Sequence, residues 1–290
     1  MKTLKPYLEM SKLRIVTLVL ITTSIGFFLG QQHQGVGDWG WGLWLLTLLG
    51  TGMAASGAAC LNNYLERDLD GLMSRTRNRA LPSGSIHPVS ALLYGINMVL
   101  CGVALLVMTA NLLTGFIVLL TAFLYVLVYT PLKRSTWLNT SIGAIPGALP
   151  PVSGWTAVTG SIDVGALALF AILFIWQHPH FYAIAWMCRD DYRQAGFKML
   201  SVVDESGKRM FRHILIHSVL LIIVATIPTL IGMTGWIYLI GSVGLGLMVL
   251  WVGWDLSQSA SLIDARKLLR ASVYYLPILF GLIIADILWL

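Results

Sequence analysis

The chain has 290 residues, of which 57% are hydrophobic and only 11% are charged, and its formal net charge is +6. Ordinary soluble domains carry about 25% charged residues, so this composition argues against a soluble protein and predicts an integral membrane protein. The apolar runs lack the alternation of an outer-membrane barrel, so the predicted fold class is all-α. The chain lacks a basic tail with interleaved aromatic residues, so the sequence does not suggest nucleic acid as a partner. The positive charge instead predicts contact with anionic membrane lipid.

Nine apolar runs, each long enough to cross a bilayer as a helix, follow one another along the chain. They cover residues 13–30, 42–62, 89–109, 112–130, 138–157, 164–186, 213–233, 236–254 and 271–289. All 19 Lys and Arg residues fall before or at the very start of the first run, or in alternate loops. The positive-inside rule therefore predicts a polytopic protein with nine transmembrane helices, a cytoplasmic N-terminus and an outer C-terminus. Trp39 and Trp41, in an outer loop, are expected in the interfacial aromatic belt.

We expect one transmembrane domain over residues 1–290. Two cytoplasmic loops are long, at about 63–88 and 187–212, and each begins with acidic residues at the end of a span. Charged side chains next to a membrane segment are costly and mark functional sites. The sequence therefore predicts that function is concentrated on the cytoplasmic side.

The first long loop contains a dense group of charged residues. Asn62, Glu66 and Asp70 are four residues apart, so on a helix they share one face. An amide and two carboxylates in a row are suitable oxygen ligands for Mg²⁺. Four arginines lie beside this row and are expected to bind phosphate oxygens: Arg67, Arg75, Arg77 and Arg79. Asp68 points away from the row and is expected to pair with an arginine. A charged loop that is merely solvated is the alternative, and the one-face spacing argues against it.

The next motif lies around the fifth apolar run. Tyr129, Lys133, Arg134 and Asn139 precede it, and the run contains glycines and prolines inside a membrane segment. Such residues are tolerated where a helix is bent, lines a cavity or is packed against its neighbours. We expect a broken helix at a substrate cavity, and close helix crossing through small residues is the alternative.

The third motif is at the end of the sixth run. His178 and His180 flank a proline, and they are candidates for haem ligands, proton acceptors or diphosphate donors, with simple packing as the alternative. Asp190 and Asp191 offer a second acidic arm for a second Mg²⁺, one of the two being merely solvated. His213 and His217 are four residues apart on the seventh run, where polar packing is preferred over metal binding.

Three segments give the chain a family resemblance: NNYLERDLDGLMSRTRNRALPSG, YTPLKRSTWLNTSIGAIPGALPPVSGW and WQHPHFYAIAWMCRDDYRQAGFKML. Through them the chain resembles the protohaem IX farnesyltransferases (haem O synthases), a branch of the UbiA-type intramembrane prenyltransferases. The resemblance implies a bacterial inner-membrane enzyme whose helices surround a central cavity open to the cytoplasm. It also implies transfer of farnesyl from farnesyl diphosphate to the vinyl group of haem B, with Mg²⁺, giving haem O and diphosphate. Haem A synthase or terminal oxidase assembly are the implied downstream partners.

The resemblance also assigns roles to residues. It implies catalytic positions at Asn62, Glu66, Asp70, Arg77, Lys133 and Asp191, and metal ligands at Asn62, Glu66, Asp70, Asp190 and Asp191. Substrate contacts are implied for Arg67, Arg75, Arg79, Tyr129, Arg134, Asn139, His178 and His180. Two departures from the superfamily pattern are present: Glu66 replaces the central aspartate of the first motif, and the second pair of acids comes later in the chain.

Two other functions are consistent with the sequence. One is prenyl transfer to an aromatic quinone precursor, and the other is a haem or metal transporter or assembly factor that uses the histidines as ligands. A transporter is expected to have polar residues at the bilayer midplane on several spans. Here the polar residues gather at the cytoplasmic ends, which favours the enzyme.

Overall fold

The computed structural model describes residues 5–35 and 40–289, with the side chains of 287–289 left out; Lys2 and Trp39 lie outside this part of the chain. Every regular element in the described part is helical. In chain order the helices are α1 (Lys5–Met10), α2 (Leu13–Gln34), α3 (Trp41–Asp70), α4 (Pro88–Thr109), α5 (Leu112–Phe123), the π-helix η1 (Leu124–Tyr129), α6 (Thr130–Leu132), α7 (Asn139–Ala148), α8 (Pro150–Thr159), α9 (Val164–Met187), α10 (Arg189–Gln194), α11 (Leu200–Val203), α12 (Lys208–Leu230), α13 (Trp236–Ser259) and α14 (Leu262–Trp289). The all-α prediction is confirmed.

Eight helical segments in the described part of the chain are long and apolar enough to cross a membrane. The predicted fifth span is instead two helices of ten residues each, α7 and α8, so the count of nine spans is not confirmed. The break comes at Leu149, because Pro150 and Pro151 lack N–H groups and suit the first turn of a new helix. The expected break in the helix is therefore present, and its place at a substrate cavity stays a prediction.

Close packing through small residues accompanies this break. A Cβ atom added at Gly26 of α2 or at Gly154 of α8 would lie only 1.9 Å from a backbone oxygen of the other helix. Further along, Gly143 and Gly147 of α7 leave room for the Tyr129 ring and the Gln177 side chain. Both interpretations of the glycine- and proline-rich run, a broken helix and a close crossing, thus hold together.

Several helices extend beyond the predicted spans. α3 continues to Asp70, and α12 and α14 begin at Lys208 and Leu262 rather than at residues 213 and 271. The predicted bounds were wrong at these ends because apolar length marks the hydrocarbon layer, whereas a helix continues into the interface wherever its backbone hydrogen bonds do. The extension of α3 matters most, because it makes the whole acidic motif helical.

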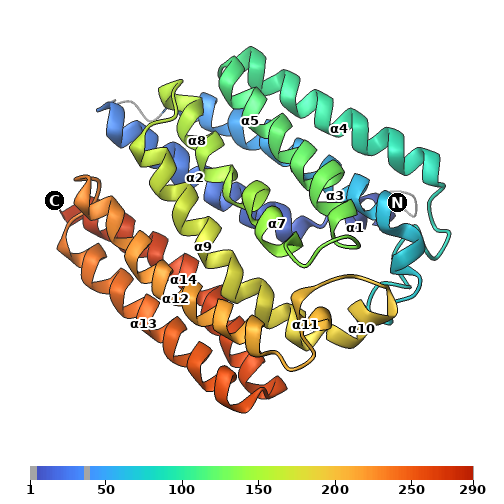
Figure 1. Cartoon of the computed structure of the whole chain (residues 1–290). Coiled ribbons are helices and arrows are strands. Elements are labelled where there is room, and N and C mark those ends of the chain that lie inside the picture. The colour runs from blue at the N-terminus through green and yellow to red at the C-terminus, as the bar shows by residue number, and fades with distance from the viewer. Residues whose placement is uncertain (1–4, 36–39, 290) are drawn as a thin grey trace.

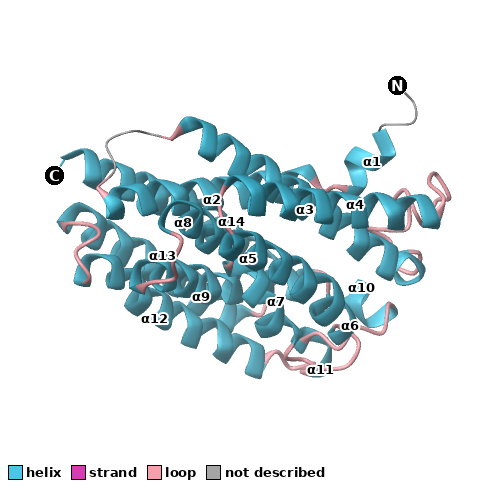
Figure 2. Cartoon of the chain, turned by 90° about the horizontal axis from the view of Figure 1, so that it is seen from above, coloured by secondary structure: helices cyan, strands magenta, loops and turns pink. Residues whose placement is uncertain are grey.

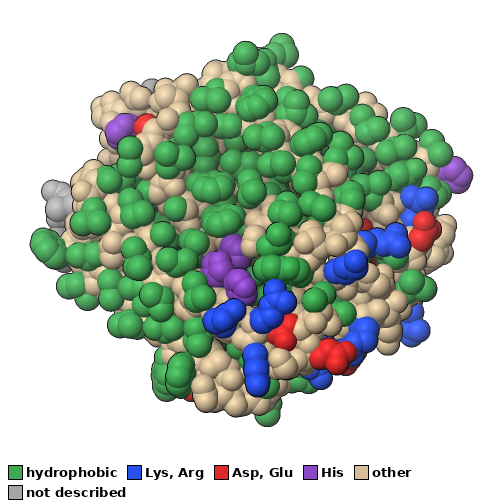
Figure 3. Space-filling model, in the orientation of Figure 1, with side chains coloured by type: hydrophobic (Ala, Val, Ile, Leu, Met, Phe, Trp, Pro, Cys, Tyr) green, Lys and Arg blue, Asp and Glu red, His purple; other side chains and the backbone are tan. Residues whose placement is uncertain are grey.

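The long helices run side by side, and the short helices α6, α10 and α11 lie at one end of the bundle (Figures 1 and 2). α3 packs on α4, α2 packs on α8, and α9 contacts α7, α12 and α14. Large side chains such as Trp155, Tyr182, Tyr238 and Tyr275 are fully buried. Figure 3 shows that most Lys, Arg, Asp and Glu side chains on the visible face lie at the end that carries α10 and α11. The rest of that face is mainly hydrophobic, as expected for a surface in contact with lipid.

Candidate active site at the charged end of the bundle

The three oxygen-bearing residues of the first motif form a buried row on α3, here called the acidic row. Asn62, Glu66 and Asp70 are 1%, 5% and 1% exposed. Asp68, between them, has a side chain that is 86% exposed and lies 3.8 Å from Arg67. The predicted shared face and the predicted outward direction of Asp68 are both confirmed. The functional role of the row stays a prediction.

Each member of the acidic row contacts one cationic side chain. Lys12 Nζ donates to Asn62 Oδ1 at 2.7 Å, and Lys133 Nζ donates to Glu66 Oε1 at 2.7 Å. The third contact is from Arg79 to Asp70 Oδ2, at 2.8 Å. The other carboxylate oxygen, Asp70 Oδ1, is buried and has no hydrogen-bond partner among the described residues. An orphaned buried oxygen is costly unless a ligand or ion completes it.

The burial of these cations shifts their pKa values. Burial, together with the nearby charges of Arg79 and Lys133, lowers the pKa of Lys12 to about 7. Burial also acts to lower the pKa of Lys133, but the adjacent carboxylate of Glu66 outweighs it and the pKa is raised. Lys133 therefore keeps its charge, whereas Lys12 titrates near neutral pH. The site has a permanent ammonium group at Glu66 and a titratable one at Asn62.

The π-helix η1 positions Lys133. Pro131 cannot donate to a carbonyl in the preceding turn, and its ring would collide with that carbonyl in a regular α-helix, so the chain widens into a π-turn. Thr130 Oγ1 donates to the Tyr125 carbonyl at 2.8 Å and accepts from Asn62 Nδ2 at 3.0 Å. The Lys133 ammonium lies 4.7 Å from the centre of the Tyr129 ring. These contacts fix the start of the next loop against the acidic row.

The two acidic motifs meet through one aspartate. Asp191 Oδ1 accepts a hydrogen bond from Ser74 Oγ, in the loop after α3, at 2.9 Å. Asp190 has a side chain that is 75% exposed and pairs with Arg193 at 3.1 Å. The structure thus brings Asp191 toward the first motif. It leaves Asp190 in solvent, which agrees with the expectation that one of the two aspartates is merely solvated. Among the described residues, no three His, Cys, Asp or Glu side chains converge as a metal cage.

The other predicted residues are divided between the site and its surroundings. Arg75 and Arg79 line a pocket of about 680 Å³ beside α1. Arg67 instead donates to the Tyr64 carbonyl at 2.8 Å, and Asn139 uses its amide to hold the backbone carbonyls of Thr136 and Lys198. Arg77 and Arg134 are exposed.

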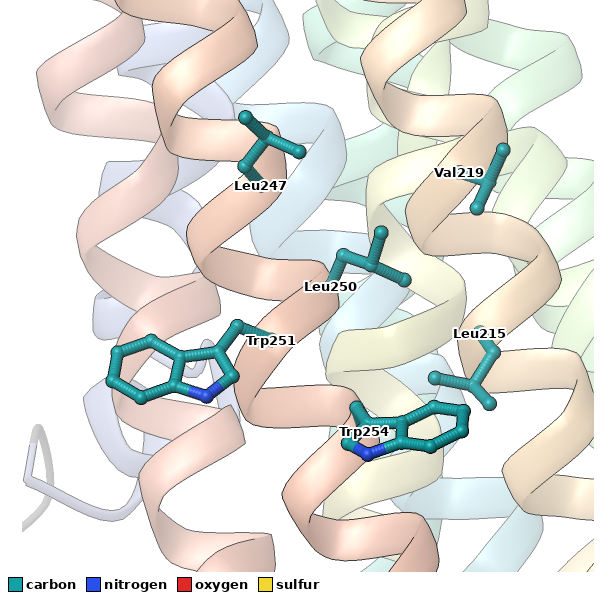
Figure 4. A pocket seen from close by; sticks show the side chains of 6 residues that line it. All are labelled: Leu215, Val219, Leu247, Leu250, Trp251 and Trp254. Carbon is teal, nitrogen blue, oxygen red and sulfur yellow. The ribbon is translucent and has the colours of Figure 1, made fainter.

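A second pocket lies far from this chemistry, between α12 and α13. Figure 4 shows its lining of Leu215, Val219, Leu247, Leu250, Trp251 and Trp254. It is apolar and lies on the outer surface of the bundle, where Trp251 is 68% exposed and Trp254 is 54% exposed. It has no group that could take part in a reaction.

Comparison with known proteins places this arrangement in a family. The model of the UbiA prenyltransferase family matches residues 19–278, which is most of the chain. The chain belongs to the UbiA prenyltransferase family. Proteins named protoheme IX farnesyltransferase are similar over nearly the whole length. The one from Solibacter usitatus (strain Ellin6076) is 42% identical and is matched over 98% of this chain and 99% of its own. The one from Aquifex aeolicus (strain VF5) is 38% identical, with 98% and 95% matched.

Solved structures of other family members share the fold. A structure described as digeranylgeranylglyceryl phosphate synthase has a TM-score of 0.82 with 18% sequence identity, and the match covers 100% of both chains. A UbiA homologue from Archaeoglobus fulgidus bound to GPP and Mg²⁺ has a TM-score of 0.68 with 18% identity, covering 96% of this chain and 99% of that one. At such low identity these matches establish the shared fold.

Sequence reasoning missed two residues of this UbiA family site. Lys12 was counted only as a basic anchor before the first span, yet it reaches Asn62. It adopts φ 50°, a left-handed conformation that is strained for a residue with a side chain and is found at functional sites. Thr130 was quoted only as part of a motif. Neither has a local signal, because their partners are 50 and 68 residues away in the chain.

The two candidate histidines of this family member point in different directions. His178 is 1% exposed, and its Nδ1 and Nε2 atoms lie 2.8 Å from the Phe174 carbonyl and 3.0 Å from Ser141 Oγ of α7. His180 faces α14, where its Nδ1 lies 2.9 Å from Ser272 Oγ. Residues two apart on a helix lie on nearly opposite sides. A single bound molecule on α9 therefore meets only one of the two rings directly.

Proposed function

We propose that the protein transfers a farnesyl group from farnesyl diphosphate to the vinyl group of haem B, giving haem O and diphosphate. The observation that carries the proposal is the buried acidic row, with its unpartnered oxygen at Asp70 and its three cations. The choice of haem as acceptor is supported by the name protoheme IX farnesyltransferase of relatives similar over the full length.

The residues fit Mg²⁺. Mg²⁺ prefers oxygen ligands and is usually held by one or two carboxylates together with substrate phosphates. Asn62, Glu66 and Asp70 supply oxygen atoms, and Asp70 Oδ1 is available without breaking an existing bond. Asp191 would serve the second metal site, whereas Asp190 is less suited because it pairs with Arg193. When bound, Mg²⁺ would neutralise the charge of the diphosphate leaving group.

The cationic side chains stabilise the same leaving group. Breaking the allylic C–O bond leaves the electron pair on diphosphate and a carbocation on the farnesyl chain. Negative charge develops on that oxygen in the transition state. Preorganised cations near it therefore attract it more strongly in the transition state than in the ground state. Lys133 and Arg79 are in position to bind diphosphate oxygens, and Arg75 and Arg77 extend this positive surface toward the cytoplasm. Tyr129 lies beside Lys133 and fixes its direction.

The acceptor side is assigned to α9. The vinyl group of haem adds to the carbocation, water then adds to the resulting porphyrin-side cation, and the water loses one proton. His180 is suited to accept that proton. Ser272 donates its own hydrogen to the Leu269 carbonyl, so it accepts from His180 Nδ1–H, which leaves the His180 Nε2 lone pair free.

The direct test is to incubate the purified protein in membrane nanodiscs with Mg²⁺, farnesyl diphosphate and haem B, and to measure haem O by mass. Formation of haem O that stops with excess chelator is expected. Transfer to an aromatic quinone precursor instead of haem would favour the quinone branch of the family. Haem binding without any product would favour a carrier role.

A further inference from the structure

Three histidines meet on the far side of α9 from His180; we call them the histidine trio (His178, His213 and His217). The His178 and His217 rings stack with their centres 3.9 Å apart and an angle of 12° between their planes. The His213 ring lies 5.9 Å from that of His217. The trio joins α9 to α12 and is separate from the acidic row, which lies on α3. Nothing in the proposed reaction uses it.

The hydrogen bonds determine which imidazole nitrogen of the trio is free. His178 donates its Nδ1–H to the Phe174 carbonyl, so its Nε2 accepts from the Ser141 hydroxyl and is occupied. His217 donates its Nδ1–H to the His213 carbonyl at 2.7 Å. Its Nε2 therefore carries a lone pair, and no described residue bonds to it. The His217 side chain is partly exposed, so a ligand can approach it from the surface of the bundle.

The hydrogen bond at His217 Nδ1 is the arrangement commonly found for a histidine that binds a metal. An Nδ1–H bond to a backbone carbonyl fixes the tautomer and the ring direction and leaves Nε2 to bind the metal. The trio does not form a cage for a free ion, because the stacked rings are parallel and His178 Nε2 is in use. One open nitrogen at a protein surface is instead suited to a metal that brings its other ligands with it, as the iron of a porphyrin does.

The surroundings of His217 fit an amphiphilic ring. Next to it on α12, Ile216 is 46% exposed and Leu220 is 36% exposed, which gives an apolar surface facing lipid. Toward the charged end, Arg212 comes five residues earlier, about 7.5 Å along the helix axis. Arg209 lies one turn further, 5.0 Å from the Trp137 ring. Figure 3 shows histidines beside Lys and Arg side chains, bordered by hydrophobic ones. Guanidinium groups bind carboxylates such as propionates.

We propose that the face between α7 and α12 is a docking site for haem that is distinct from the position where haem reacts. His217 Nε2 binds the iron, Arg209 and Arg212 hold the propionates, and the porphyrin edge rests on Ile216 and Leu220. The identity of the ligand rests on the proposed function, whereas the site itself rests on the geometry of the trio. The site is next to the loop that follows Lys133, since the Trp137 ring lies 5.8 Å from that of His213.

The test uses the full-length protein in nanodiscs, titrated with ferric haem and followed by its Soret band and its electron paramagnetic resonance signal, which is high-spin when one histidine is the only strong ligand to the iron. The variants are His217→Gly, His217→Gln and His180→Ala, with His33→Ala as the matched control, since His33 is exposed in a distant part of the bundle. Metal-free protoporphyrin IX is the second probe, because it keeps the ring and propionates and lacks the iron.

We expect both His217 variants to weaken haem binding by about tenfold or more and to lose the histidine-ligated spectrum. Added imidazole should restore that spectrum in His217→Gly, which also shows that the variant is folded. Metal-free protoporphyrin should bind equally to all variants, and His33→Ala should behave as the unmodified protein. In turnover, the His217 variants should raise the KM for haem and leave kcat unchanged.

An unchanged spectrum and affinity in the His217 variants would overturn the docking site, as would loss of the spectrum in His180→Ala alone. If either of these results is found and the unmodified protein still forms haem O, the proposed function stands without the docking site. If it forms no haem O while the His217 effects are present, the reaction is wrong and the docking site stands.

Discussion

Replacing Lys133 with Met removes the ammonium group that lies 2.7 Å from Glu66 Oε1. The two side chains are only 15% and 7% exposed, so water screens the pair weakly. At 2.7 Å and an effective dielectric constant of about 20, the Coulomb attraction is roughly 6 kcal/mol. Desolvation offsets part of this attraction, and removing one partner of a buried pair costs about 3–5 kcal/mol. We expect Lys133→Met to lower the free energy of unfolding by that amount.

The chain contains a matched control for this prediction. Lys267 pairs with Asp264 at the same distance of 2.7 Å, but the Lys267 side chain is 57% exposed. Water screens such an exposed pair, so Lys267→Met should change the free energy of unfolding far less than Lys133→Met does. Burial of the ammonium group is thus the main difference between the two substitutions.

Two measurements complete the test. Unfolding of the detergent-solubilised protein, followed by loss of helical circular dichroism, gives the change in stability. The rate of haem O formation, at a temperature where both variants are folded, should fall about 100- to 1000-fold in Lys133→Met, because a preorganised donor to the leaving group is lost. Lys267→Met should keep full activity. Equal destabilisation by the two substitutions would refute the argument from burial, and normal turnover in Lys133→Met would refute its role at the diphosphate.

Three further predictions follow from the site. Asp70→Asn should lose most activity while the protein still inserts and folds, whereas Asp68→Asn, at an exposed side chain, should not; equal turnover of the two in a mass-detected assay would exclude the metal role. The pKa of Lys12 is about 7 in the folded chain and 10.5 when unperturbed, so the unfolded state binds more protons between these values and stability should rise with pH across that window. Lys12→Met should remove this part of the slope in unfolding measurements, and an identical slope would contradict the assignment. A cysteine placed at Arg77 should be protected from membrane-impermeant thiol reagents in intact cells. Labelling of that cysteine from outside would contradict the predicted orientation.

The sequence by itself determined the features that depend on local spacing. The apolar runs predicted a polytopic helical protein, and the four-residue spacing of Asn62, Glu66 and Asp70 predicted a shared face. Both depend on the helical repeat and on the cost of burying charge, which are properties of neighbouring residues. The break of the fifth run was also predictable, because Pro150 and Pro151 carry their backbone restrictions with them.

Only the tertiary structure decided which distant groups meet. Lys12 contacts Asn62 across 50 residues, and Lys133 contacts Glu66 across 67. Such contacts are decided by the packing of helices against one another. The family resemblance singled out Lys133 but not its partner, and Lys12 has no sequence pattern that separates it from a membrane-interface anchor. The same reason explains the histidines. Spacing drew attention to His178, but its hydrogen bonds use both nitrogens, and the open nitrogen belongs to His217, whose partners come from the crossing of α9 and α12.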